Sequence, residues 1–384
     1  MLTSRIIFTN FKVKINNFFI KKELTNLLKQ NDEVVKSLSL NYSYSFNIKK
    51  LKKFKNKKFF RIVGIGGSIL GAKAIYYFLK NKIKKKFVFV DNLTPKINHN
   101  IKKKYTNIVI SKSGNTIETI INCNILLKKK EKNIFITENK INYLNELARR
   151  LKSEVIHHNN FIGGRYSVLS EVGMLPAELM GLKINKFKQL NSLIKNKIFL
   201  NNLISNVSSI LYFLKKKKFN SIIINYDEKL ENFLKWYQQL VAESLGKKSK
   251  GVLPIISNMP KDNHSVMQLY LDGFKNNFYT FFYVKENASE KINNLKLFSK
   301  YKFLKNKNLD NIIYAQKRAT EKVFNKKKIP FRSFEINNRD EEVLGELFSF
   351  FILETILLGK VMKLNPFDQP EVELIKKETK KILV

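Results

Sequence analysis

The chain has 384 residues, of which 44% are apolar, and a formal net charge of +41. This length is sufficient for two α/β domains and a large buried core. No stretch reaches the roughly 18 consecutive apolar residues of a membrane span, so we expect no transmembrane segment. The N-terminal sequence lacks the compact apolar run of a secretory signal. The single cysteine, Cys123, excludes an intrachain disulfide framework and is typical of a cytoplasmic protein.

The positive charge comes almost entirely from lysine, because only eight of the 72 basic residues are arginine. Recognition of nucleic acids relies heavily on arginine, whose planar side chain binds bases and phosphates with two hydrogen bonds. The lysine excess also accompanies abundant Asn, Ile and Phe, all of which have AT-rich codons, so a compositional bias accounts for it. We therefore expect weak, salt-sensitive binding of polyanions and no specific nucleic-acid partner.

The first 50 residues are rich in lysine and asparagine and have weak periodicity, and we expect a helical arm there. Between residues 51 and 185, short β-like runs alternate with helix-like runs, which predicts a first α/β domain with a parallel sheet covered on both faces. The β-like runs are 59–65, 85–92, 106–111, 133–139 and 154–158.

Residues 186–338 are predicted to form a second α/β domain. Strands are expected at 220–228, 277–286 and 329–338, and a long helix at 229–247. The remaining residues, 339–384, begin with the apolar, strongly helical sequence DEEVLGELFSFFILETILLGKVMKL, which should be buried against other elements. The sequence NPFDQP then ends that helix.

Two polar corners between a strand and a helix indicate an anion site at the carboxyl ends of the first sheet. The sequence SKSGNT, residues 111–116, places hydroxyls, a lysine and a glycine at a helix N-terminus, which favours phosphate. An ordinary helix N-cap at Thr116 is the alternative. The second corner, GIGGSILG at 64–71, lacks the third glycine of the dinucleotide-binding motif and has no Walker lysine. A small phosphorylated ligand is therefore favoured over a nucleotide.

Three side chains are candidates for chemistry. Arg165 follows two glycines in GGRYSVLSEVGMLP and is one of the few arginines in the chain. Glu243 lies near the end of a helix that is mostly apolar or amide-bearing, where a carboxylate is suited to act as a general base. His264, in KDNHSVMQLYLDG, is one of four histidines.

These motifs together resemble the glucose-6-phosphate isomerase family, which is built from two sugar-isomerase (SIS) domains. They occur in the order of the family and cover most of the chain from about residue 60. The matching stretches are GIGGSILG, SKSGNTIET, GGRYSVLSEVGMLP, AESLGK, DNHSVMQLYLDG and the C-terminal LGELFSFFILETILLGKVMKLNPFDQPEVELIKK. The resemblance implies two three-layer αβα domains of the SIS type with parallel central sheets, followed by C-terminal helices that complete the active site.

The resemblance also implies an activity, the reversible conversion of glucose 6-phosphate to fructose 6-phosphate through a cis-enediolate, without a metal or other cofactor. Glu243 would transfer the proton, Arg165 would stabilise the enediolate, and His264 and Lys376 would assist ring opening. The residues that would bind the substrate and its phosphate are Ser68, Ser111, Lys112, Ser113, Thr116, Gly164 and Gln369. A homodimer is implied, in which His264 is supplied by the partner subunit.

Near the C-terminus the chain departs from the family pattern. Glu371 stands where the family usually has glycine and Ile375 alters the spacing before the lysine, so either Lys376 or Lys377 can be the catalytic one. Lys261 replaces a small residue ahead of the histidine. Two alternatives remain open from sequence: a dual phosphoglucose/phosphomannose isomerase, and a non-catalytic SIS-type regulator that binds a sugar phosphate.

Overall fold

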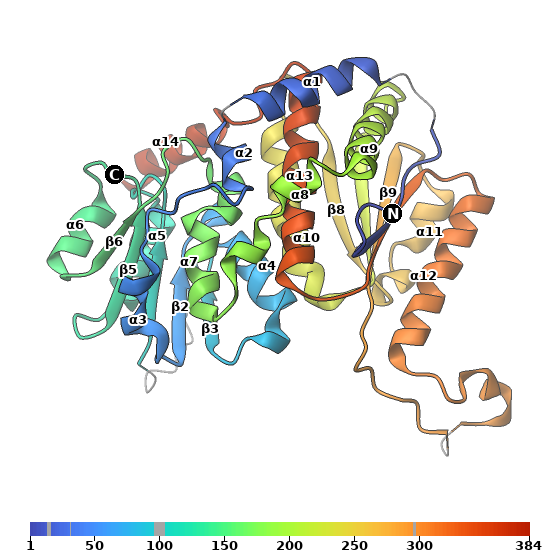
Figure 1. The fold of residues 1–384 in the computed structure, drawn as a ribbon, viewed down its shortest axis with the longest axis horizontal. Coiled ribbons are helices and arrows are strands. Elements are labelled where there is room, and N and C mark those ends of the chain that lie inside the picture. The colour runs from blue at the N-terminus through green and yellow to red at the C-terminus, as the bar shows by residue number, and fades with distance from the viewer. Residues whose placement is uncertain (14–16, 31, 96–103, 295–296) are drawn as a thin grey trace.

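A computed structural model describes residues 1–13, 17–30, 32–95, 104–294 and 297–384. It contains two five-stranded sheets, each covered by helices, with helix α13 (Glu341–Val361) between them (Figure 1). Helix α10 (Glu231–Leu245) of the second half packs on α4 (Leu70–Phe78) of the first half, which joins the two halves.

The first sheet is parallel throughout and has the strand order β3-β2-β4-β5-β6. All five β-like runs predicted for residues 51–185 are confirmed as its strands. These are β2 (Phe59–Val63), β3 (Lys86–Val90), β4 (Thr106–Ile110), β5 (Lys132–Thr137) and β6 (Glu154–His157).

Alternate residues of this sheet enter two separate cores, as the two-residue period of a strand requires. Ile108 of β4 packs in the core that also holds α4 and α7, whereas Val109 packs with α5 and α6. The predicted αβα arrangement is therefore confirmed. The helices are α5 (Ile117–Leu126), α6 (Tyr143–Arg150) and α7 (Glu171–Met180), with α3 (Ile48–Lys55) preceding β2.

The second sheet has the order β1-β10-β9-β7-β8 and includes one antiparallel strand. The predicted strands are confirmed as β7 (Asn220–Asn225), β9 (Asn277–Val284) and β10 (Phe331–Ile336). Two strands were not predicted, β8 (Leu253–Asn258) and β1 (Ile6–Thr9), and β1 pairs antiparallel with β10. The predicted parallel sheet is thus confirmed for β7, β8, β9 and β10, and β1 adds an antiparallel strand at its edge.

Helices cover both faces of the second sheet in the same way. Phe282 and Phe334 pack with α10 and α13, whereas Tyr279 and Phe281 pack with Phe324 of α12. The helices are α8 (Leu190–Leu193), α9 (Lys197–Lys215), α11 (Met267–Asp272) and α12 (Leu309–Lys326).

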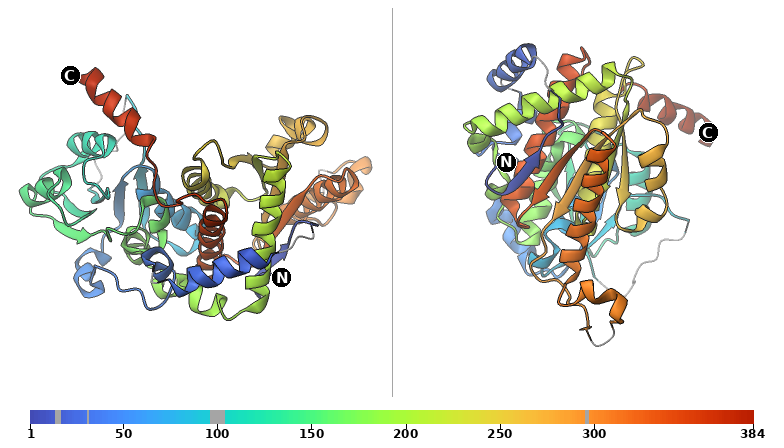
Figure 2. Two further views of the ribbon diagram at one scale, coloured as in Figure 1. Left: turned by 90° about the horizontal axis from the view of Figure 1, so that it is seen from above. Right: turned by 90° about the vertical axis from the view of Figure 1, so that its right-hand side faces the viewer.

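The N-terminal residues are only partly helical. They supply strand β1 as well as helices α1 (Phe18–Lys29) and α2 (Glu33–Ser37), so the expected helical arm also extends the second sheet. At the other end of the chain, α14 (Val372–Leu383) has no buried residue and projects from the body (Figure 2).

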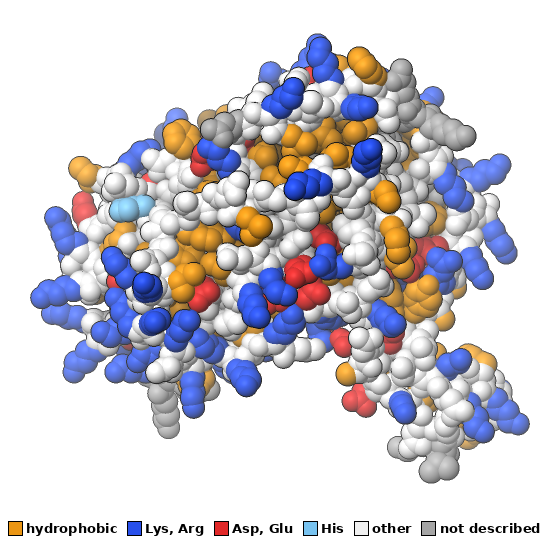
Figure 3. All heavy atoms as spheres, in the orientation of Figure 1, with side chains coloured by type: hydrophobic (Ala, Val, Ile, Leu, Met, Phe, Trp, Pro, Cys, Tyr) orange, Lys and Arg blue, Asp and Glu red, His pale blue; other side chains and the backbone are white. Residues whose placement is uncertain are grey.

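Lysine and arginine side chains are spread over the visible face of the molecule rather than gathered in one stripe (Figure 3). Within the described part of the chain, every helix is too short or too polar to cross a lipid bilayer. Cys123 lies on the buried face of α5, where burial raises the pKa of its thiol to about 12.

A buried ion pair fastens α13 to the second sheet. Arg332 of β10 and Glu354 of α13 are both fully buried and are bonded to each other. Arg332 also donates to Thr280 Oγ1 at 2.9 Å and to Asn206 Oδ1 at 2.8 Å. Strands β9 and β10 and helices α9 and α13 therefore meet at one guanidinium.

We predict that Glu354→Leu lowers the free energy of unfolding by about 3–5 kcal/mol, because it leaves Arg332 buried without a counter-charge. The double variant Arg332→Met/Glu354→Leu should lose much less, and urea titration of both variants measures the difference. As a control, Glu378→Leu breaks the exposed pair with Lys381 and should cost less than about 1 kcal/mol. Equal losses in the single and double variants would contradict this account of the pair.

Candidate active site

Glu243 lies in the last turns of α10 and is partly buried. Gln239 is four residues earlier on the same helix, a spacing that places both side chains on one face. Its Nε2 donates to Glu243 Oε1 at 2.8 Å. The Gln239 Oε1 atom is buried and has no hydrogen-bond partner within the described structure. Gln239 was not singled out from sequence, although its spacing from Glu243 was a usable signal.

Arg165 lies in the 3₁₀ turn Gly164–Leu169 and is almost completely buried. A guanidinium has five N–H donors, and here each finds an acceptor. Nε donates to Ser244 Oγ at 2.9 Å, Nη1 to Glu243 Oε2 at 3.0 Å, and Nη1 also to Gln369 Oε1. Nη2 donates to the carbonyls of Pro366 and Asp368, both at 2.8 Å. The structure thus brings together three predicted site residues, Arg165, Glu243 and Gln369.

A series of hydrogen bonds, all donated in the same direction, holds the Nε atom of Arg165 in place. The Tyr166 hydroxyl donates to the Pro366 carbonyl at 3.0 Å, so it accepts from Ser244 Oγ, 2.7 Å away. Ser244 Oγ in turn accepts from Arg165 Nε. Burial raises the pKa of Tyr166 to about 12, so its hydroxyl keeps the proton that this chain needs. Neither Tyr166 nor Ser244 was predicted, because their roles depend on tertiary contacts.

The glycine-rich corner after β2 lies against the turn that carries Arg165. A Cβ added to Gly67 would stand 2.2 Å from the carbonyl carbon of Gly164, so only glycine permits this approach. A Cβ added to Gly66 would lie 2.8 Å from Gln239 Nε2. Ser68 ends this 3₁₀ turn (Gly66–Ser68), directly after the glycine that contacts Gly164.

The second corner joins β4 to α5 and lies beside the first, since a Cβ on Gly64 would approach the Ile110 carbonyl oxygen at 2.9 Å. Gly114 has a φ of +68°, and a Cβ there would collide with Asn142 Oδ1 at 2.1 Å. Thr116 occupies the N-cap position of α5, but its side chain makes no capping hydrogen bond. Its hydroxyl instead lies 2.9 Å from Ser111 Oγ. Thr116 therefore does not form the ordinary helix N-cap that was the alternative from sequence.

Lys112 and Ser113 complete this corner. The Lys112 ammonium donates to the Asn160 carbonyl at 2.7 Å and lies 3.5 Å from the Glu138 carboxylate. Ser113 is exposed, and its Oγ accepts from the Asn115 amide at 3.3 Å. Both side chains lie at the rim of the corner, where a ligand can reach them.

Two predicted catalytic residues lie apart from this cluster. His264 is exposed and follows the carboxyl end of β8. The start of β8 is the end near Glu243, because Gln238 of α10 donates to the Pro254 carbonyl at 2.8 Å. Lys376 lies on the projecting helix α14 and pairs with Glu373 at 2.6 Å. Lys377, the alternative to Lys376, is likewise exposed on α14.

The donors of this site are suited to a phosphorylated organic ligand. They are hydroxyls, backbone amides at the start of α5, one lysine and one arginine. Throughout the described residues, no three His, Cys, Asp or Glu side chains are grouped in a way that could hold a metal ion.

Solved structures share this fold. A hypothetical protein of Thermus thermophilus superposes with a TM-score of 0.82 at 22% identity, covering 96% of this chain and 94% of the other. A glucose-6-phosphate isomerase of Chlamydia trachomatis gives a TM-score of 0.70 at 19% identity, covering 94% and 78%. At these identities the likeness shows the αβα fold with parallel sheets.

Sequence relatives establish the family. The model of the phosphoglucose isomerase family matches residues 50–258. The glucose-6-phosphate isomerase of Methanocaldococcus jannaschii is 31% identical, covering 94% of this chain and 93% of the relative. That of Mycoplasmopsis synoviae is 33% identical, covering 82% and 80%. With this match and with Arg165, Glu243 and the two glycine-rich corners gathered at one place, the chain belongs to the phosphoglucose isomerase family.

Proposed function

We propose that the chain is a glucose-6-phosphate isomerase, which interconverts glucose 6-phosphate and fructose 6-phosphate as a step of glycolysis and gluconeogenesis. The observation that carries this proposal is the 3.0 Å contact between Arg165 and Glu243 beside two hydroxyl-bearing corners. A base next to a fixed guanidinium is what proton transfer through an enediolate requires.

The two corners bind the phosphate group of the substrate in this proposal. Hydroxyl donors come from Ser68, Ser111, Ser113 and Thr116, and the Lys112 ammonium adds charge. The free amides at the start of α5 face the same place, and Gly164 lets the sugar approach the backbone. These contacts are remote from the reacting carbons, so they supply positioning.

Glu243 acts as the single base. Its carboxylate removes the proton from C2 of the open aldose and returns it to C1, while the hydroxyl proton passes from O2 to O1. Gln239 fixes one oxygen of this carboxylate through its amide nitrogen. Arg165 stabilises the charge of the cis-enediolate between these steps.

The site is shared between two subunits in this proposal. Strand β8 has six residues, which span roughly 20 Å and separate His264 from the end of α10 that carries Glu243. His264 of one subunit therefore opens the sugar ring bound to its partner. Lys376 assists at the ring oxygen, with Lys377 as the alternative, and Gln369 contacts the substrate. The protein acts in the cytoplasm, a location that its single buried cysteine supports.

Glu243→Gln should lower kcat by about 100-fold or more, because a general base contributes roughly 10²–10⁴. Binding of fructose 6-phosphate should be nearly unchanged, as isothermal titration calorimetry would measure. The control is Glu231→Gln, which removes a partly exposed carboxylate from the first turn of the same helix and should leave both quantities unaltered. Full turnover by the Glu243 variant would exclude it as the base.

Ser244→Ala and Tyr166→Phe should each lower kcat about tenfold with a small change in KM, because the guanidinium of Arg165 loses its fixed orientation. The increase in activation free energy in the double variant should be smaller than the sum of the increases in the two single variants. The difference, which is the coupling energy of the two residues, should be roughly 0.5–3 kcal/mol. Ser349→Ala is the matched control, since this buried hydroxyl has no hydrogen-bond partner within the described structure. An unchanged kcat in both single variants would show that the chain of hydrogen bonds does not serve catalysis.

Mixing inactive Glu243→Gln chains with inactive His264→Asn chains should restore about a quarter of the wild-type activity. Random exchange makes half of the dimers hybrids, and each hybrid has one of its two sites intact. The mixture is assayed after exchange of subunits under mild denaturant, and size-exclusion chromatography verifies the dimer. No recovery in verified hybrids would place both residues in the site of a single chain.

A further inference from the structure

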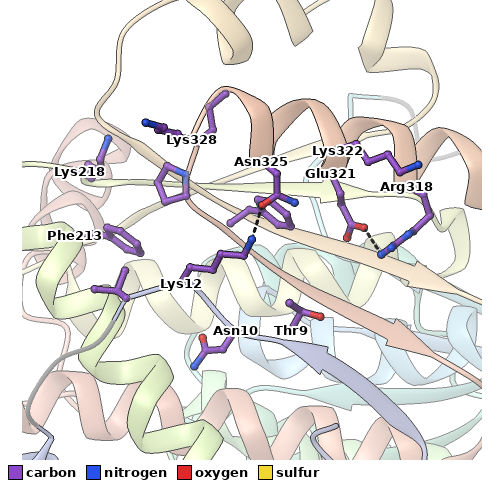
Figure 4. Close-up of a pocket in the computed structure, with 14 residues that line it drawn as sticks. Thr9, Asn10, Lys12, Phe213, Lys218, Arg318, Glu321, Lys322, Asn325 and Lys328 are labelled. Atoms are coloured by element: carbon purple, nitrogen blue, oxygen red, sulfur yellow. Dashed lines mark hydrogen bonds and ion pairs between the residues drawn. The ribbon is translucent and has the colours of Figure 1, made fainter.

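A second cleft, of about 680 Å³, lies away from the active-site cluster on the second domain (Figure 4). Phe331 begins β10, Thr9 ends the antiparallel strand β1, and Lys218 precedes β7. The cleft is therefore at the amino edge of the second sheet, whereas the anion corners follow the carboxyl ends of the first sheet. It shares no residue with the site around Arg165 and Glu243.

The cleft brings together basic side chains from separate segments of the chain, and most of them have no ion-pair partner in the described structure. Its basic residues are Lys12, Lys218, Arg318, Lys322 and Lys328. Arg318 is paired with Glu321, the carboxylate of this cleft, at 2.9 Å. No carboxylate in the described structure lies within ion-pair distance of the four lysines. Lys12 bonds only a neutral amide, that of Asn325, at 3.0 Å.

Apolar side chains beside these lysines indicate a ligand with an apolar part. Phe213, Ile329, Pro330 and Phe331 supply an apolar wall. Burial and the nearby Lys275 lower the pKa of Lys218, which reflects the lack of a counter-charge.

We propose that this cleft binds a small polyanion with an apolar body, of the nucleoside polyphosphate class. The phosphates lie among the lysines that project from α12 and from the segments before β7 and β10, and the base lies against the phenylalanines. The cleft volume falls within the range of roughly 300–1,000 Å³ of small-molecule sites. Because the cleft is separate from the isomerase site, such a ligand and the sugar phosphate bind at the same time.

A comparable cleft of about 670 Å³ at the amino edge of the first sheet provides the control. It is also rich in lysine, but Glu131 and Glu154 lie among its cations. Changing Lys129 and Lys130 there removes the same charge as changing Lys322 and Lys328, so it measures the contribution of surface charge alone.

The test is calorimetric titration of the full chain with ATP at about 150 mM salt, where exposed charges are screened beyond roughly 8 Å. We expect one ATP per chain, bound at least about tenfold more tightly than AMP or inorganic triphosphate. Lys322→Gln/Lys328→Gln should weaken ATP about tenfold, because charge-assisted hydrogen bonds are lost. Lys129→Gln/Lys130→Gln should change it less than about twofold.

Three outcomes would overturn the proposal. Equal weakening by the two double variants would assign ATP binding to general surface charge. Inorganic triphosphate binding as tightly as ATP would remove the role of the apolar wall. Displacement of ATP by fructose 6-phosphate, measured on the Glu243→Gln protein to avoid turnover, would place ATP in the isomerase site. None of these outcomes depends on whether the chain is active as an isomerase.

Discussion

The guanidinium of Arg165 is the interaction on which the arrangement of the active site depends. Its five donors reach α10 through Glu243 and Ser244 and reach the segment after α13 through Pro366, Asp368 and Gln369. A rigid planar group with every donor engaged permits only one relative placement of these segments. Glu243, its neighbour Gln239 and the C-terminal residues are therefore positioned by one side chain, which the close contact of Gly67 with Gly164 holds in turn.

Three of the other arginines are also buried or mostly buried in this lysine-rich chain, whereas Arg149, Arg150 and Arg318 are exposed. Arg61 and Arg332 are buried like Arg165, and Arg339 binds both carboxylate oxygens of Asp227. Lysines, by contrast, populate the surface (Figure 3), and buried Lys188 and Lys317 are exceptions. Arginine persists where a fork of donors is needed, because an ammonium cannot reproduce that geometry. The compositional bias has thus acted on the surface and left the buried polar centres intact.

The sequence was informative where structure is local. Strands buried on both faces, such as β4 and β9, were predicted because their apolar runs are continuous. Strand β1 was missed because its partner, β10, is more than 300 residues away, and β8 because Pro254 breaks a short edge strand. In the site, Arg165 and Glu243 were identified from motifs. Ser244 and Tyr166 were not, since only the packing of α10 against the 3₁₀ turn Gly164–Leu169 brings them together.

The two domains are built alike but differ in charge at corresponding edges. Central strand β7, between β8 and β9, corresponds to β2, between β3 and β4. After β2 and β4 come the glycine and hydroxyl corners, whereas Asp227 follows β7 and Glu286 follows β9. Arg339 and Lys229 pair with these carboxylates, at 3.4 and 3.0 Å from Glu286. This edge of the second sheet therefore carries ion-paired carboxylates where the first sheet has its glycine and hydroxyl corners. The second half of the chain contributes α10, and thereby Glu243, to a candidate site whose two glycine-rich corners come from the first half.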